Sequence, residues 1–169
     1  MAKNVNKASD PKIYHRDETP TIGIRIVTPY AGMFAEVTKL RKEIVQWLKE
    51  QEIEPSGYGY LRYYVIDMAG NMDIEYGYVV EEPIAGNGRI QPGSLPAGRY
   101  VSLIYSGGGY QGNKALVEHV RSNNLPVDRW DTPEGDNFRC RFEMYLTDPK
   151  IEPRKTKWDI EVAFKLKDE

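Results

Sequence analysis

Apolar residues recur along the chain with two different periods, which predict where helices and strands form. Between residues 34 and 48 they recur at steps of three and four, with Lys, Arg and Glu between them, as is typical of an amphipathic helix. A shorter helix is predicted from Gln111 to about Ser122, with Leu116 and Val120 facing inward. The apolar positions of the longer helix are Phe34, Val37, Leu40, Ile44, Trp47 and Leu48.

Alternation of apolar and polar residues predicts strands in much of the remaining chain. It begins at Thr21, after which Ile22, Ile24 and Ile26 occupy every second position. The other predicted strands cover residues 59–67, 72–82, 99–105, 139–146 and 158–166. Together with the two helices, these segments predict an α+β fold with an antiparallel sheet.

The order strand–helix–strand–strand occurs twice, in residues 21–83 and again in residues 94–167. An alignment of LRYYVID with FEMYLTD places Tyr64 on Tyr145. We interpret the pattern as a duplication whose halves are related by a pseudo-twofold axis, with a central ligand groove between them.

The beginning of the chain has neither period. Residues 1–20 are polar and aperiodic, which predicts a flexible N-terminal arm. Residues 21–169 are then expected to form a single domain made of the two repeats.

Composition and charge exclude several classes of protein. The net charge of −2 and the pI of about 5.8 give no basic surface for nucleic acid, so no direct nucleic-acid binding is expected. No apolar run approaches the roughly 18 residues of a membrane span, so no membrane contact is expected. Cys140 is the single cysteine, and with two histidines it cannot form the usual zinc cluster or an intrachain disulfide. We therefore expect a cytoplasmic protein without metal or cofactor.

Catalytic motifs are poorly supported. The segment SGGGYQGNK follows a predicted strand but lacks the spacing of a phosphate-binding loop, because Lys114 is followed by Ala115. Cys140 alternates with arginines on the face of Phe142, which is typical of a small buried hydrophobic residue. His119 is best interpreted as a surface or boundary residue of the short helix.

The strongest candidate site lies in the strand RFEMYL, where alternation places Glu143 and Tyr145 on one face. The repeat alignment adds Tyr64, and Tyr110 begins the second helix. A carboxylate surrounded by tyrosine rings can bind an organic cation, and when buried it can act as an acid or base. The alternative is that Glu143 faces solvent, or forms an ordinary ion pair with Arg62, the residue aligned with it.

Two longer segments resemble a known family. SLPAGRYVSLIYSGGGYQG (residues 94–112) resembles the entry to the second half of the gyrase-inhibitor-like (GyrI-like) small-molecule-binding domains. EMYLTDP (residues 143–149), followed by TKWDIEVAFKL, resembles the closing pair of strands in that family. In the first half, TPYAGMF departs from the family's turn pattern. The resemblance therefore gives less support for a contribution of the first half to the groove.

The resemblance implies a duplicated fold with a ligand groove between the halves. It also implies that Glu143 is the glutamate that binds lipophilic cations among aromatic rings in multidrug-sensing transcription regulators. The turn tyrosine of the family matches Tyr110, and Trp158 is the candidate aromatic residue of the last strand. Tyr64 enters through the internal repeat rather than through a family motif.

Three functions follow from this resemblance. The first is a stand-alone binding protein for small lipophilic compounds, cationic ones included, since we find no helix-turn-helix segment. The second is a hydrolase of strained cyclopropane rings in genotoxic compounds, with Glu143 activating water or protonating the substrate. The third is an inhibitor that binds DNA gyrase through an acidic surface.

Overall fold

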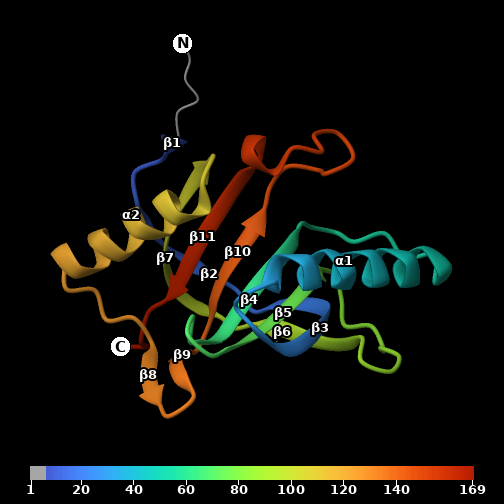
Figure 1. Ribbon diagram of the computed structural model, residues 1–169, viewed down its shortest axis with the longest axis horizontal. Helices are drawn as coiled ribbons and strands as arrows, with labels where there is room; N and C mark the ends of the chain where they lie inside the picture. Colours follow the sequence, from blue (N-terminus) through green and yellow to red (C-terminus); the bar gives the residue numbers. More distant parts are fainter. Residues whose placement is uncertain (1–6) are drawn as a thin grey trace.

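The computed structural model describes residues 7–169 and contains the predicted repeat (Figure 1). The sheet order β7-β11-β10-β4-β5-β3 is symmetric about the pair β10–β4, so each half contributes three antiparallel strands and one helix. This confirms the α+β fold and the duplicated strand–helix–strand–strand order. The first repeat comprises β3 (Thr19–Pro29), α1 (Met33–Glu50), β4 (Gly59–Ile66) and β5 (Asn71–Val79), and the second comprises β7 (Gly98–Ser106), α2 (Gly109–Ser122), β10 (Arg141–Tyr145) and β11 (Asp159–Lys165).

Five shorter strands extend the sheet, and one 3-10 turn lies outside it. Two strands pair with β7, one pairs with β3, a hairpin extends β4, and one turn of 3-10 helix precedes β11. They are β1 (Lys7–Ala8), β2 (Lys12–Arg16), β6 (Gln91–Leu95), β8 (Arg129–Thr132), β9 (Gly135–Phe138) and η1 (Lys155–Lys157).

The segment predicted to be a flexible arm instead contributes two strands, β1 and β2, from residue 7 onward. Strand β2 pairs antiparallel with β7, which satisfies the backbone groups along that edge of the sheet. Tyr14 stacks on Tyr100, with ring centroids 6.2 Å apart, and its hydroxyl donates to a Glu161 carboxylate oxygen at 2.7 Å. These partners are distant in sequence, so the polar pattern of the segment does not show them. Residues 1–6 lie outside the described residues.

The repeat alignment drawn from the sequence is wrong about which side chains share a face. In the ladder between β4 and β10, Glu143 pairs with Leu61, whereas Arg62 pairs with Phe142. Glu143 therefore shares its face with Leu61, and Arg62 and Tyr64 point to the opposite face. Because side chains alternate along a strand, an alignment displaced by an odd number of residues exchanges the two faces.

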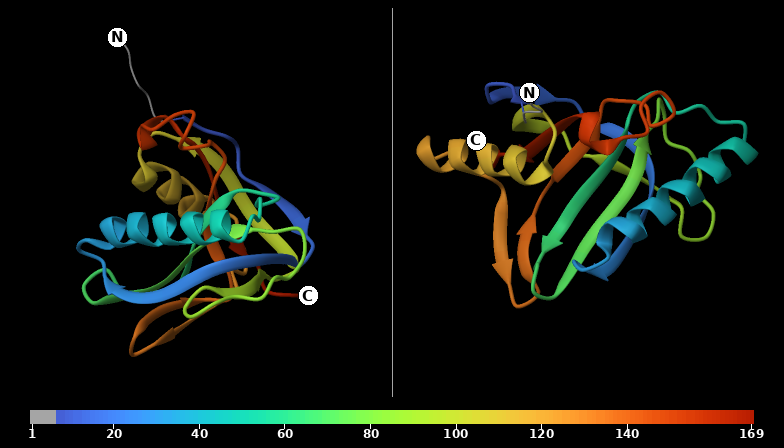
Figure 2. Two further views of the ribbon diagram at one scale, coloured as in Figure 1. Left: turned by 90° about the vertical axis from the view of Figure 1, so that its right-hand side faces the viewer. Right: turned by 45° about the horizontal axis from the view of Figure 1, so that its top comes forward.

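Each face of the curled sheet covers a hydrophobic core. The face that carries both helices packs against Leu40, Ile44 and Leu116 among others. Figure 2 shows α1 and α2 on this face, with β10 and β4 running between them. The other face encloses a smaller core of seven buried residues, which are Tyr60, Leu95, Tyr100, Cys140, Phe142, Met144 and Ala163.

The enclosed face also contains buried charged groups with defined partners. Tyr60 donates its hydroxyl proton to the Glu75 carboxylate at 2.9 Å, and Arg62 donates to two backbone carbonyl oxygens. Burial raises the pKa of Glu75 above its usual value, although the Tyr60 hydrogen bond and Arg62 oppose the change.

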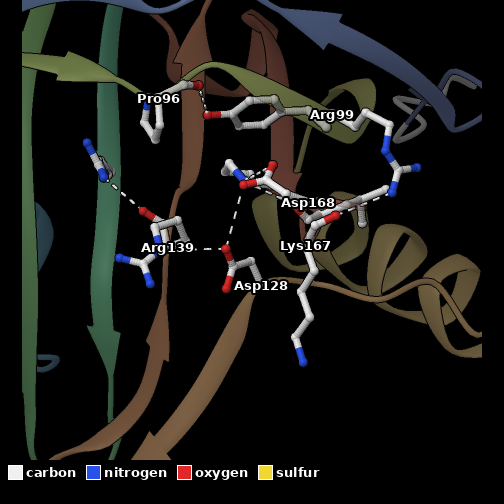
Figure 3. A network of polar contacts seen from close by, with 10 residues as sticks. Pro96, Arg99, Asp128, Arg139, Lys167 and Asp168 are labelled. Carbon is white, nitrogen blue, oxygen red and sulfur yellow. Dashed lines mark hydrogen bonds and ion pairs between the residues drawn. The ribbon is translucent and has the colours of Figure 1, made fainter.

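A second buried charge lies near the C-terminus. Lys165 donates to the Leu166 carbonyl and to Asp168, each at 3.1 Å, and Asp128 lies within 3.8 Å. Figure 3 shows Asp128 and Asp168 converging in this network. Neither Glu75 nor Lys165 lines the cleft described below, so we assign both to the scaffold.

Candidate functional site

A cleft of about 920 Å³ opens on the helix-bearing face beside α1. Its walls come from α1, from the segment between α1 and β4, from β5, and from the connection between β10 and β11. This volume is at the upper end of the range for small-molecule sites. Its aromatic lining consists of Phe34, Tyr58, Tyr76, Tyr78, Tyr145 and Trp158.

The wall formed by the second repeat is held by one hydrogen bond and one ring contact. Trp158, which follows η1, donates its indole N–H to the Glu152 carbonyl at 2.6 Å. Its ring meets Tyr145 edge to face, with centroids 5.7 Å apart. Because both rings are buried, this corner of the cleft is fixed by packing as well as by the hydrogen bond.

The lining continues from Tyr145 to Tyr76, whose ring centroids are 6.4 Å apart. The alternation of β5 places Tyr76 and Tyr78 on the cleft side. Their rings meet edge to face at 5.7 Å, and their hydroxyl oxygens are 3.3 Å apart. Gly59 on the neighbouring strand leaves room for this pair, because a Cβ there would lie 2.6 Å from the Tyr76 hydroxyl oxygen. Any larger residue at position 59 would therefore displace the tyrosine.

Glu143 does not itself line the cleft, but it contacts the lining residue Tyr145. It is only 7% exposed, so the interpretation that it faces solvent is wrong. Asn113 of α2 donates to Glu143 Oε2 at 3.1 Å, and the Tyr145 hydroxyl lies 3.4 Å from Oε1. The carboxylate is therefore engaged from a helix on one side and from its own strand on the other.

A buried arginine continues this network. Arg141 donates to the Asn113 amide oxygen at 3.1 Å, and its guanidinium lies over the rings of Phe138 and Phe164. Burial lowers the pKa of Arg141, and the nearby Glu143 opposes that change. The order Arg141–Asn113–Glu143 thus links a cation to the carboxylate through one amide.

The carboxylate also acts on the surrounding phenols. Burial raises the pKa of Tyr63, Tyr105 and Tyr145, and the negative charge of Glu143 raises each of them further. These hydroxyls therefore stay protonated at neutral pH and can serve as hydrogen-bond donors.

Lys155 places a third charge in the site. Its ammonium lies 4.3 Å from the centre of the Phe34 ring and 5.9 Å from the centre of the Tyr145 ring. The residue as a whole is exposed, but burial of the ammonium lowers its pKa, and Glu143 opposes this. This contact could not be predicted from the sequence, because it depends on the path of the connection between β10 and β11.

Of the five residues predicted for the site, Tyr145 and Trp158 line the cleft, and Glu143 contacts Tyr145 without lining it. Tyr110, at the start of α2, is 74% exposed and does not line the cleft. Tyr64 lies on the other face of the sheet, where Arg25 and Arg62 stack on its ring at 3.6 and 4.4 Å.

The site also includes residues that the sequence analysis did not select. Tyr76 and Tyr78 could have been found from their alternation in a predicted strand. Asn113 could not, because its role depends on how α2 packs over β10. The added residues are Phe34, Tyr58, Tyr76, Tyr78, Asn113, Arg141 and Lys155.

Residues 7–169 offer neither a metal-binding cluster nor a membrane-spanning helix. This part of the chain contains no cluster of three or more His, Cys, Asp or Glu side chains that could bind a metal ion. None of its helices is both long and apolar enough to cross a membrane.

Comparisons with solved structures show the same fold at low sequence identity. EcmrR, in the cryo-EM structure of its DNA complex in EcmrR-RPo, matches 97% of this chain with a TM-score of 0.72 and 19% identity. This chain spans 58% of that EcmrR chain. SAV2435, solved bound to tetraphenylphosphonium, matches with a TM-score of 0.62 and 11% identity, covering 94% of each chain.

A third structure, a hydrolase from Listeria innocua, matches with a TM-score of 0.58 and 10% identity, covering 93% of this chain and 91% of the other. A search of curated proteins finds no match. The family model for the GyrI-like small molecule binding domain matches residues 9–167, nearly the whole chain. The chain therefore belongs to the GyrI-like small-molecule-binding domain family.

Proposed function

We propose that this protein binds small lipophilic compounds with aromatic groups in the cleft beside α1. The observation that carries this proposal is the cleft of about 920 Å³ with six aromatic residues in its lining. Rings of this kind offer apolar faces for stacking, and the tyrosine hydroxyls add hydrogen bonds at their edges.

A lipophilic cation is compatible with these walls, since aromatic rings attract cations. The ligand named for SAV2435, tetraphenylphosphonium, belongs to this chemical class. In this chain, however, the Lys155 ammonium already lies over Phe34 and near Tyr145. A bound cation would therefore compete with Lys155 for these two rings.

The broader roles implied by the family remain predictions. We propose a multidrug or effector-binding role of the stand-alone type for this cleft. Hydrolysis by Glu143 and inhibition of gyrase have no observation in their favour beyond the resemblance. The buried carboxylate is engaged by Asn113 and Tyr145, an arrangement that is equally suited to binding.

Binding can be tested with Nile red, a fluorescent dye whose binding does not depend on the charge of the site because the dye is neutral. Its emission should increase and shift to the blue when it enters the cleft. Thr38→Trp fills the cleft from α1, whereas Lys42→Trp adds the same ring outside the lining of the cleft. We expect Thr38→Trp to reduce the affinity at least tenfold and Lys42→Trp to leave it unchanged.

Two results would contradict the proposal. One is the absence of saturable dye binding by the wild-type protein. The other is equal affinity in the two tryptophan variants, because the dye would then be bound elsewhere. Circular dichroism of each variant checks that the fold is retained.

A further inference from the structure

We infer that the cleft selects ligands that combine an aromatic body with an anionic group, and that Lys155 and Arg41 bind this group. This inference rests on the proposed function and specifies the class of ligand. Its evidence comes from the charges around the cleft and from the partners that those charges lack.

Lys155 occupies the position in which an organic cation would be expected. Its ammonium lies close to the rings of Phe34 on α1 and Tyr145 on β10. The negative charge of Glu143 acts to raise its pKa. Such a set of rings and a carboxylate is what recognises a cationic ligand. Here the chain supplies the cation itself, so the negative charge of Glu143 is offset before any ligand arrives.

Glu143 has a second positive partner on its other side. Asn113 links it to the buried guanidinium of Arg141, whose side chain lies on the same face of β10. One carboxylate is thus placed between two cations. A cationic ligand would be repelled by Lys155 and Arg141, while an anionic group would be attracted by Lys155.

The lining of the cleft itself carries more positive than negative side chains. The acidic residues are Glu54 and Asp148, and Asp148 already accepts a hydrogen bond from the backbone N–H of Lys150 at 2.8 Å. The basic residues of the lining are Arg41, Lys49, Lys150 and Lys155.

These four cations have no carboxylate partner within ion-pair distance in residues 7–169. Elsewhere arginines do find such partners, as Arg25 does with Asp73 and Arg89 with Glu43. Arg41 is half-buried and near the Tyr76 hydroxyl, where its positive charge opposes the rise that burial causes in the pKa of Tyr76. An unpaired guanidinium beside an aromatic wall attracts the negative charge of an aromatic anion.

The test uses two probes of nearly the same size and shape but opposite charge, tetraphenylborate and tetraphenylphosphonium. Isothermal titration calorimetry with the wild-type protein should show at least tenfold tighter binding of tetraphenylborate. In Lys155→Met, the affinity for tetraphenylborate should fall at least fivefold and the affinity for tetraphenylphosphonium should rise. A loss of fold would weaken both probes, so these opposite changes exclude it.

Lys157→Met is the matched control. Lys157 is two residues away, is exposed, and lies outside the lining of the cleft, so its substitution changes the net charge equally without changing the site. We expect both affinities in this variant to stay within twofold of wild type. Equal effects of Lys155→Met and Lys157→Met would overturn the role of Lys155.

The remaining outcomes separate the inference from the function on which it rests. If Nile red binds but tetraphenylphosphonium binds as tightly as tetraphenylborate or more tightly, the anion selectivity is wrong while the binding function stands. The same conclusion follows if Nile red binds and neither charged probe does. If no probe binds, both the function and the inference fail.

Discussion

Gly112 of α2 offers a sharp test of how the second helix is seated on the sheet. Alanine normally stabilises a helix relative to glycine by about 1 kcal/mol. In this structure a Cβ at position 112 would lie 2.3 Å from Cδ1 and 2.4 Å from Cγ of Tyr105. These contacts are roughly 1.2 Å shorter than the shortest favourable separation between carbon atoms.

The cost of Gly112→Ala can be set against the gain in helix propensity. Tyr105 is buried, so its ring cannot move aside into solvent, and either α2 or the strand beneath it must shift. Overpacking of this severity costs about 3 kcal/mol. After subtraction of about 1 kcal/mol for the better helix former, we expect a net loss of about 2 kcal/mol. For a chain of this size the melting temperature should fall by about 4–8 °C.

Urea denaturation followed by circular dichroism measures this loss. The double variant Gly112→Ala/Tyr105→Leu tests its cause, because the substitution at position 112 should cost much less once the ring has been removed. Gly109→Ala is a second control, since its Cβ would only approach the Tyr105 hydroxyl oxygen at 3.3 Å. A Gly112→Ala protein as stable as wild type would refute the proposed seating of the helix.

Three further predictions concern other parts of the molecule. Trp158→Ala should destabilise the fold by about 3 kcal/mol in urea denaturation and weaken Nile red binding, whereas Trp158→Phe should retain most of both. Because burial raises the pKa of Glu75, the folded protein binds a proton at this carboxylate more tightly than the unfolded chain does. Lowering the pH from 7 to 5 should therefore stabilise the wild type relative to Glu75→Gln. Equal dependence of the unfolding free energy on pH in the two proteins would contradict this. Tyr110→Ala and Tyr64→Ala should each change Nile red affinity less than twofold, because neither ring lines the cleft; a tenfold loss in either would show that the site extends to that ring.

The secondary structure was largely predictable because it depends on periods that the sequence itself carries. The helix predicted from the apolar positions between residues 34 and 48 forms over Met33–Glu50, and the second forms over Gly109–Ser122. Strand β2 was missed because its five residues are stabilised by β7, which lies more than eighty positions further along the chain. A local pattern contains no information about such a partner.

The site was predictable only in part, for a similar reason. Alternation and resemblance together select Glu143 and Tyr145, which the structure places in contact with each other on one regular strand. The choice of Tyr64 failed because an alignment of two short tyrosine-containing strands does not fix which face each residue takes. Lys155 was beyond prediction, because its position over Phe34 depends on an irregular connection.

The position of Trp158 gives the protein an internal optical reporter. Of the three tryptophans in the sequence, it alone lines the cleft. Its ring contacts Tyr145, which can transfer excitation energy to it. Trp130 is 41% exposed, and Trp47 lies on α1 outside the cleft lining. A ligand stacked in the cleft should therefore quench the emission of a buried indole while the emission of Trp130 persists. Ligands without colour or fluorescence of their own can then be screened by intrinsic fluorescence, without any label.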